Sequence, residues 1–229
     1  MKLTIENGKL LKCVGDEKIA VIDDTVSVIG AYAFKGFEEL EEVSLPDTIK
    51  AIEGGAFEKC KSLTKINIPE SIEEIGNNAF SWCENLKEFS LPRGVTKIGI
   101  GAFSFCFSIE RVNVPECITE LENSAFTRCK SLKNAVIPAN VKKVGDYAFS
   151  NCDCLEMVDI YDGVTELGNF AFADCISLTD IKIPKSVTKI GYGAFAGCDS
   201  LKYIKVPRDN NYDTKWTIDC PEKTRIIEY

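Results

Sequence analysis

The chain has 229 residues, of which 45% are hydrophobic and 27% are charged, a composition typical of a folded globular protein and not of a disordered one. Its formal net charge of −8 disfavours binding to nucleic acid or to anionic lipid. It contains no histidine, which excludes the commonest general base and every histidine-dependent catalytic triad. No apolar run approaches the roughly 18 residues of a membrane-spanning helix, so we expect no membrane insertion.

The first residues predict a hairpin. Asn7-Gly8 stands between two apolar stretches in LTIENGKLLKCV, and this dipeptide is a strong signal for a tight β-hairpin turn. We therefore predict a hairpin over residues 2–14, within an N-terminal cap of residues 1–16. The segment has no apolar core of the signal-peptide kind, so we expect a cytoplasmic protein, with an extracellular or cell-surface location as the alternative.

The middle of the chain is built from repeats. The dipeptide Ala-Phe recurs eight times at a constant 23-residue spacing, from Ala33-Phe34 to Ala194-Phe195. A proline follows each phenylalanine after twelve residues, except at Tyr161, and a cysteine follows it after three, except at Phe37. Such columns in constant register are the signature of a solenoid. We predict about eight 23-residue repeats over residues 17–207.

Residues 63–85 show how one repeat is built. Apolar and polar residues alternate from 63 to 68, as in a half-buried strand, and Pro69 ends the strand because it has no N–H. Residues 72 and 75 then point inward, and Gly76 permits a tight turn. The apolar spacing of residues 79–86 favours a short helical or 3₁₀ turn.

The repeat breaks after Arg208, and residues 209–223 are irregular. Thr224, Ile227 and Tyr229 nevertheless stand one full repeat length after Leu201, Ile204 and Val206. We therefore predict a last strand in TRIIEY, within a C-terminal cap of residues 208–229. Residues 1–229 are expected to form a single domain.

The repeat resembles a known family. The pattern L-x-x-I-x-I-P-x-x-V-x-x-I-G-x-x-A-F-x-x-C-x-x is clearest in LTKINIPESIEEIGNNAFSWCEN (63–85) and LTDIKIPKSVTKIGYGAFAGCDS (178–200), and it is similar to the BspA-type leucine-rich repeat. The resemblance implies a curved, right-handed solenoid that is mostly β with short helical or 3₁₀ turns. It also implies a parallel sheet on the concave face.

Eleven cysteines are an odd number, which disfavours a full disulfide framework. Seven of them form a column that faces the core, where cysteine behaves as a small apolar residue. We predict buried thiols there, with some disulfides or a metal or redox role as alternatives. Cys13, Cys117, Cys154 and Cys220 lie outside the column and are predicted to be more reactive. No C-x-x-C pair exists, so a zinc site is disfavoured.

Catalysis has little support in the sequence. Carboxylate pairs such as Glu73-Glu74 are adjacent in turns, no insertion breaks the repeat to build a pocket, and no glycine-rich phosphate loop is present. We predict a protein that is not an enzyme and that needs no cofactor or metal.

Outward-facing strand positions vary while the core columns stay constant. If the rungs stack as predicted, these positions form three rows on one face of the sheet, acidic in the first repeats and basic in the last. The middle of the face carries Asn134, Val136, Ala139 and Met157. The predicted protein-binding residues are Asp159, Asp180, Lys182, Lys185, Lys202, Tyr203, Lys205 and Arg208.

A face of this kind suits recognition of a protein, because complementary charge sets orientation and association rate. The leading hypothesis is a noncatalytic scaffold, expected to be a monomer, that binds a protein or peptide on its concave face. The resemblance implies an adhesin-like role at the cell surface as one alternative. An intracellular inhibitor or regulator of an enzyme is the other.

Overall fold

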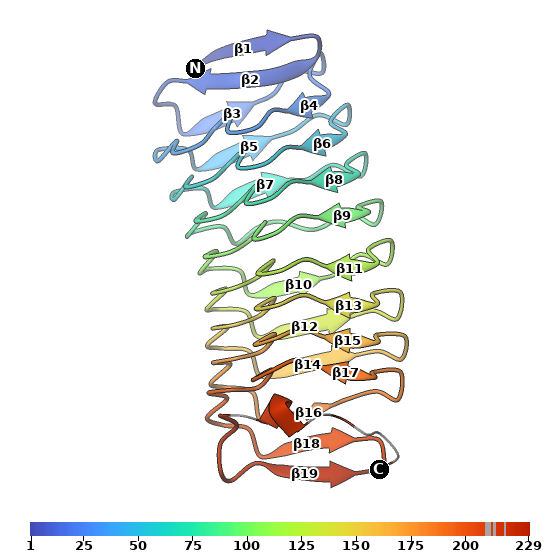
Figure 1. The fold of residues 1–229 in the computed structure, drawn as a ribbon. Helices are drawn as coiled ribbons and strands as arrows, with labels where there is room; N and C mark the ends of the chain where they lie inside the picture. Colours follow the sequence, from blue (N-terminus) through green and yellow to red (C-terminus); the bar gives the residue numbers. More distant parts are fainter. Residues whose placement is uncertain (209–211, 213, 218) are drawn as a thin grey trace.

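The computed structural model of the protein describes residues 1–208, 212, 214–217 and 219–229. The chain winds into a stack of similar rungs that runs from the N-terminus to the C-terminus (Figure 1). We number the 23-residue rungs from residue 17, so that rung 4 is residues 86–108, rung 5 is 109–131, rung 7 is 155–177 and rung 8 is 178–200. The predicted fold class, a parallel-sheet repeat solenoid, is confirmed.

Each rung except rung 4 contributes a strand to a first row on one side of the stack (Figure 1). Neighbouring strands pair in parallel, and paired residues are one repeat length apart, as in Arg111↔Asn134 and Asn134↔Met157. The row consists of β3 (Ile19–Val21), β5 (Glu42–Ser44), β7 (Lys65–Asn67), β10 (Arg111–Asn113), β12 (Asn134–Ile137), β14 (Met157–Ile160), β16 (Asp180–Lys182), β18 (Tyr203–Val206) and β19 (Arg225–Glu228).

A second row of two-residue strands lies beside the first and was not predicted. It consists of β4 (Val28–Ile29), β6 (Ala51–Ile52), β8 (Glu74–Ile75), β9 (Lys97–Ile98), β11 (Glu120–Leu121), β13 (Lys143–Val144), β15 (Glu166–Leu167) and β17 (Lys189–Ile190). A two-residue strand is too short to leave an alternating pattern in the sequence. Neighbouring rungs approach closely just after these strands, since a Cβ on Gly99 would lie 2.6 Å from the backbone nitrogen of Asn77.

The predicted helical turn around the Ala-Phe dipeptide is wrong. In rung 3, local bonds such as Ala79 N–H to Gly76 O (3.2 Å) alternate with bonds to the next rung such as Phe80 N–H to Ala102 O (2.8 Å). Trp82 adopts a left-handed φ of 63°. Because every second amide bonds across to the neighbouring rung, the segment forms linked turns and not a helix. The described 3₁₀ helix is η1 (Thr214–Thr217) near the C-terminus.

The core consists of continuous columns. The eight column phenylalanines are at most 1% exposed, and their rings stack with centroids 4.9 to 5.7 Å apart. The column thiols donate to backbone carbonyls, as Cys83 Sγ does to Phe57 O at 3.1 Å. A rung on its own could not bury these side chains, and stacking supplies the missing half of the core.

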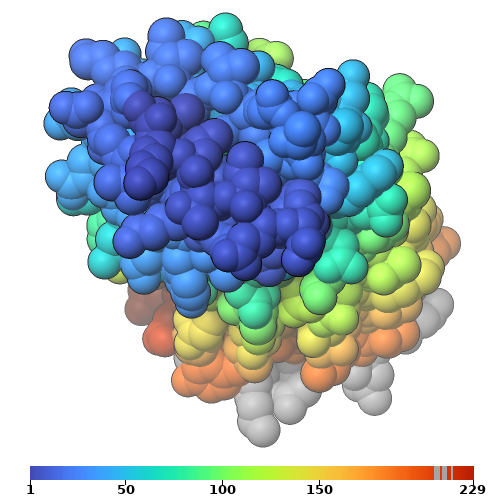
Figure 2. Space-filling view, turned by 90° about the horizontal axis from the view of Figure 1, so that it is seen from above, coloured from blue at the N-terminus to red at the C-terminus, as the bar shows by residue number. Residues whose placement is uncertain are grey.

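An antiparallel hairpin of β1 (Lys2–Glu6) and β2 (Lys9–Val14) covers the first rung. Asn7 and Gly8 both have positive φ, 49° and 75°, as a type I′ turn requires. Strand β2 continues the second row by pairing in parallel with β4. Figure 2 looks down on this end and shows the hairpin spread over the rungs beneath it.

The last strand exists, but its predicted register is wrong by one residue. Ile204 pairs with Ile226 and not with Ile227, and Cys220 likewise stands one residue short of a full repeat after Cys198. The ring of Trp216, which is 4% exposed, meets Phe195 edge-on at 6.2 Å and covers the last phenylalanine of the column. Predictions for residues 209–211, 213 and 218 lie outside the described residues.

The first row is interrupted twice within the described residues. No ladder joins β7 to β10 across rung 4, and none joins β14 to β16. The second row is interrupted once, between β9 and β11. In the described part of the chain, no helix has the length and apolar content needed to cross a membrane.

Candidate functional site

Side chains of the first row alternate between the core and solvent. In β14, Val158 and Ile160 are buried whereas Met157 and Asp159 are exposed. The same alternation holds in β5, β7, β10, β16 and β18. The predicted surface rows therefore do lie on one face of the molecule, which we call the outer face of the first row.

The eight predicted protein-binding residues are all exposed and lie at the C-terminal end of this face. Asp159 belongs to β14, Asp180 and Lys182 to β16, and Tyr203 and Lys205 to β18. Lys202 directly precedes β18, while Lys185 and Arg208 each follow a proline after a strand. The structure brings only some of them into contact: Lys205 Nζ lies 3.9 Å from the carboxylate of Asp180.

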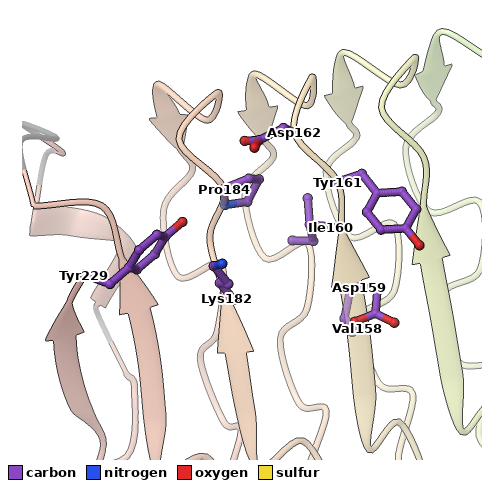
Figure 3. Close-up of a pocket in the computed structure, with 8 residues that line it drawn as sticks. All are labelled: Val158, Asp159, Ile160, Tyr161, Asp162, Lys182, Pro184 and Tyr229. Atoms are coloured by element: carbon purple, nitrogen blue, oxygen red, sulfur yellow. The ribbon is translucent and has the colours of Figure 1, made fainter.

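A hollow of about 290 Å³ lies on this face where the ladder between β14 and β16 is missing. Figure 3 shows Tyr229 and Lys182 on one side of it, Asp159 and Tyr161 on the other, and Pro184 and Ile160 between them. Val158 and Asp162 complete the lining. The floor is therefore apolar and buried, and the rim carries charged and phenolic groups.

Tyr229 forms a fixed wall of the hollow. Its hydroxyl donates to Ile183 O at 3.0 Å, 46 residues earlier in the chain, and its amide donates to Val206 O at 3.0 Å. The ammonium of Lys182 sits 4.6 Å from the centroid of its ring, within the range of a cation–π contact. Burial raises the pKa of the Tyr229 phenol, and the negative charge of Asp162 raises this pKa further.

The opposite wall is tied to rung 6. Tyr161 occupies the column that elsewhere holds proline, so it has an amide, and this amide donates to Ile137 O at 3.0 Å. Pro184 at the equivalent position of rung 8 has no amide to donate toward rung 7. Rung 7 is thus bonded to its earlier neighbour along the whole of β14, and the hollow lies on its other side.

Tyr161, Asp162 and Tyr229 line the hollow but were not among the predicted site residues. Tyr161 carried a signal, because it is the one exception in the proline column. Asp162 lies in the third predicted surface row, which is the position directly after the proline column. Tyr229 had no usable signal, since its place depends on the fold of the C-terminal segment and on a contact two rungs away.

The prediction for the off-column cysteines is wrong for two of the four. Cys13 lies in strand β2 of the hairpin with its side chain buried, and this burial raises the pKa of its thiol to about 11. Cys220 continues the buried column, and burial raises its pKa to about 11 as well. Cys117 and Cys154 are exposed, and their reactivity stays a prediction. The seven column cysteines are buried, as predicted.

The arrangement of this face favours recognition. Its exposed Met157, Tyr161 and Tyr203 offer apolar contact area, and its lysines and aspartates offer charge-assisted hydrogen bonds. Within the described ranges, no cluster of three or more cysteine, aspartate or glutamate side chains is arranged to hold a metal ion.

Comparison with known proteins agrees with the geometry. A family model described as a BspA type leucine rich repeat region matches residues 4–133 and 119–218. A leucine-rich repeat protein from Bacteroides ovatus is 30% identical over 99% of this chain, with a TM-score of 0.68. A leucine-rich repeat protein from T. pallidum is 26% identical, with a TM-score of 0.70, and the match covers 87% of this chain and 86% of that protein.

The chain spans 65% of the length of the Bacteroides ovatus protein. No curated protein matches it. The family model covers most of the chain, and both solved structures share its solenoid. The chain therefore belongs to the BspA-type leucine-rich repeat family.

Proposed function

We propose that the protein is a noncatalytic scaffold that binds a partner protein or peptide on the outer face of the first row, centred on rungs 7 and 8 and strand β18. The observation that carries the proposal is the concentration of exposed interface-type residues around the hollow. Met157 is 54%, Tyr161 55% and Tyr203 40% exposed. Methionine and tyrosine are enriched in protein interfaces, and anchor residues of this kind sit beside pockets.

The charge of the face supports a protein partner in particular. Lys182, Lys185, Lys205 and Arg208 stand on a molecule whose net charge is −8. A positive area on an otherwise acidic protein orients an approaching partner, because this area attracts the negative part of the partner and the rest of the surface repels it. The cytoplasmic location remains a prediction.

Site-specific photo-crosslinking tests the proposal. A photoreactive phenylalanine replaces Tyr203 on the proposed face or, as the matched control, Tyr32, which is 58% exposed at a turn between the two rows. We expect the Tyr203 probe, and not the Tyr32 probe, to crosslink a single stoichiometric partner from source-cell lysate or from extracellular material. The source that yields the partner also decides the compartment.

Charge variants provide the second arm. Changing Lys182, Lys185, Lys205 and Arg208 to glutamate should abolish the crosslink. Changing Lys2, Lys12, Lys59 and Lys97 to glutamate alters the net charge equally and should leave the crosslink intact, because these four exposed lysines lie elsewhere. Equal crosslinking from both probes, or equal loss in both variants, would show that this face is not the binding surface.

A further inference from the structure

The hollow lies where two surface rows change sign. In one row Asp159 on rung 7 is followed by Lys182 on rung 8, and in the next row Asp162 is followed by Lys185. Asp159, Asp162 and Lys182 line the hollow, and Lys185 follows its lining residue Pro184. One rim is therefore negative and the other is positive.

Opposite charges at equivalent positions of neighbouring rungs commonly neutralise each other elsewhere on the molecule. In the part of the chain that the structure describes, eight ion pairs join side chains that are one repeat length apart, such as Lys130 and Asp153 at 3.4 Å. Among the described residues, no ion pair of 4 Å or less joins Asp159 to Lys182 or Asp162 to Lys185. The missing ladder between β14 and β16 leaves both sets of charges available to a ligand.

The two rims are also held in place. Lys182 is held against the ring of Tyr229, whose hydroxyl and amide are both bonded to the backbone. Asp159 lies within β14 and Asp162 follows it, and this strand is fully paired with β12. Fixed charges of opposite sign across an apolar floor need little reorganisation on binding, which improves specificity.

We propose that the hollow binds an extended segment of the partner protein that carries one basic and one acidic side chain two residues apart. The basic side chain lies against Asp159 and Asp162, and the acidic one against Lys182 and Lys185. Side chains two residues apart in a strand project from the same face at about 6.6 Å, which suits rims on neighbouring rungs that are not joined by a ladder. This inference rests on the proposed function and specifies its ligand.

Arginine fits the negative rim best among the basic residues. A guanidinium can form two parallel hydrogen bonds to a carboxylate and can stack on a phenol ring, and Tyr161 stands beside the aspartates. The aliphatic stem of the arginine can cover the floor formed by Ile160 and Pro184.

Amide NMR spectra of the full isotope-labelled chain provide the test. The probes are the peptide acetyl-Gly-Arg-Ala-Glu-Gly-amide and three versions in which glutamine replaces the arginine, the glutamate or both. We expect the Arg-Ala-Glu peptide to shift the amides of residues 158–162 and 182–185 in a saturable way. Each single glutamine replacement should weaken binding by roughly five- to tenfold.

Protein variants show whether the named residues are responsible. D159N/D162N should weaken the binding of the Arg-Ala-Glu peptide by about the same factor and leave the binding of the Gln-Ala-Glu peptide unchanged. K182Q/K185Q should weaken the binding of the Arg-Ala-Glu peptide and leave the binding of the Arg-Ala-Gln peptide unchanged. The positions are exposed, so the variants should keep the wild-type spectrum elsewhere, and E70Q/R93Q, at the equivalent positions of the third row in earlier rungs, is the control.

Equal shifts from the charged and the doubly neutral peptide would overturn the inference, as would the absence of any shift in these amides. Unchanged binding of Arg-Ala-Glu to D159N/D162N would also overturn it. The crosslink at Tyr203 tests whether a partner lies on this face, and the peptides test which charges it contacts. A crosslinked partner without charge-selective peptide binding would contradict this inference and leave the proposed function intact.

Discussion

Across rungs 4 and 5 the solenoid loses both of its rows of strands, whereas across rungs 7 and 8 it loses only the first row. At the first interruption the rungs stay connected by the turns, through bonds such as Phe103 N–H to Ala125 O (2.9 Å), and by the stacked rings of Phe103 and Phe126 at 5.5 Å. At the second, β15 and β17 remain paired through Glu166↔Lys189 and Leu167↔Ile190.

The first interruption has a cause in the core. Phe89 occupies a column that holds Val43, Ile66, Val112 and Ala135 in the neighbouring rungs. Its ring packs at 5.1 Å from Phe103 and requires more room than a β-branched side chain. Glu122 also replaces the glycine that follows the second-row strand, the position of Gly99 in rung 4. Glu53 replaces this glycine as well, however, and the second row is intact there. We therefore attribute the interruption mainly to Phe89.

The second interruption has no oversized core residue, since Val158 and Ile181 occupy the same column on its two sides. It opens the outer face while the core beneath continues unbroken. A solenoid can thus open for a packing reason or at its surface alone. Both openings carry a hollow with charged residues in its lining, about 410 Å³ beside Arg93 and Glu116 at the first and about 290 Å³ at the second. The second differs in that Tyr229, bonded to Ile183 O, forms one of its walls.

Phe103→Ala should have the largest effect on stability. Loss of a buried phenylalanine costs about 3–5 kcal/mol, and at this point the turns and the stack are what hold the two halves together. We expect urea unfolding to split into two transitions, monitored by Trp82 and Trp216 on either side of the interruption.

Phe172→Ala is the matched control for that experiment. It removes the same ring beside the second interruption, where the second row is intact. A similar loss of stability with a single cooperative transition is expected there. Two transitions in both variants, or one in both, would mean that the interruptions do not differ in cooperativity.

Phe89→Ile should close the first interruption. A β-branched residue restores the column and lets rung 4 approach β10, so we expect the free energy of unfolding to rise by about 1 kcal/mol. Hydrogen exchange at the amides of Arg111 and Asn113, which face rung 4, should slow. Val158→Ile, in the same column at the second interruption, should not close that gap. Faster exchange in Phe89→Ile would show that Phe89 fills a space and does not create it.

The smallest expected effect concerns the phenol of Tyr229 at the second interruption. Its pKa is raised by burial and by Asp162, so the folded state holds this proton more tightly than the unfolded state does. The associated stability is complete below the ordinary tyrosine pKa and is lost as the pH rises through the folded value.

Asp162→Asn should move the pKa of Tyr229 partly back toward its ordinary value, because burial remains. The phenolate absorbance of each protein, compared with that of its Tyr229→Phe counterpart, measures this titration. Glu116→Gln at the first interruption is the control and should leave Tyr229 unchanged. A Tyr229 that titrates at or below the ordinary value in the wild type would contradict the electrostatic link between Asp162 and the opposite rim.

Much of the fold followed from the spacing of residues. The constant interval between Phe80, Phe103 and Phe126 predicted the stack, and the alternation in Lys65–Asn67 predicted both the strand and its outward face. The second row escaped prediction because two residues carry no period. The linked turns escaped it because their bonds to the next rung, such as Trp82 N–H to Ser104 O, have no counterpart in local sequence.

The candidate site was predictable only in outline. Asp159 and Lys182 were placed on the correct face because strand periodicity assigns each residue a side. The hollow between them depends on a missing ladder, and its wall depends on Tyr229 reaching Ile183. The register of β19, shifted by one residue through the C-terminal segment, decides where Tyr229 falls.

By itself, the sequence determined that this protein is a stack of 23-residue rungs, because a solenoid core is made of contacts between equivalent positions, and these repeat visibly along the chain. The tertiary structure alone decided where the stack opens. Whether neighbouring strands pair depends on the fit of side chains and backbone between two particular rungs, and that fit is a property of the packed pair and not of either repeat.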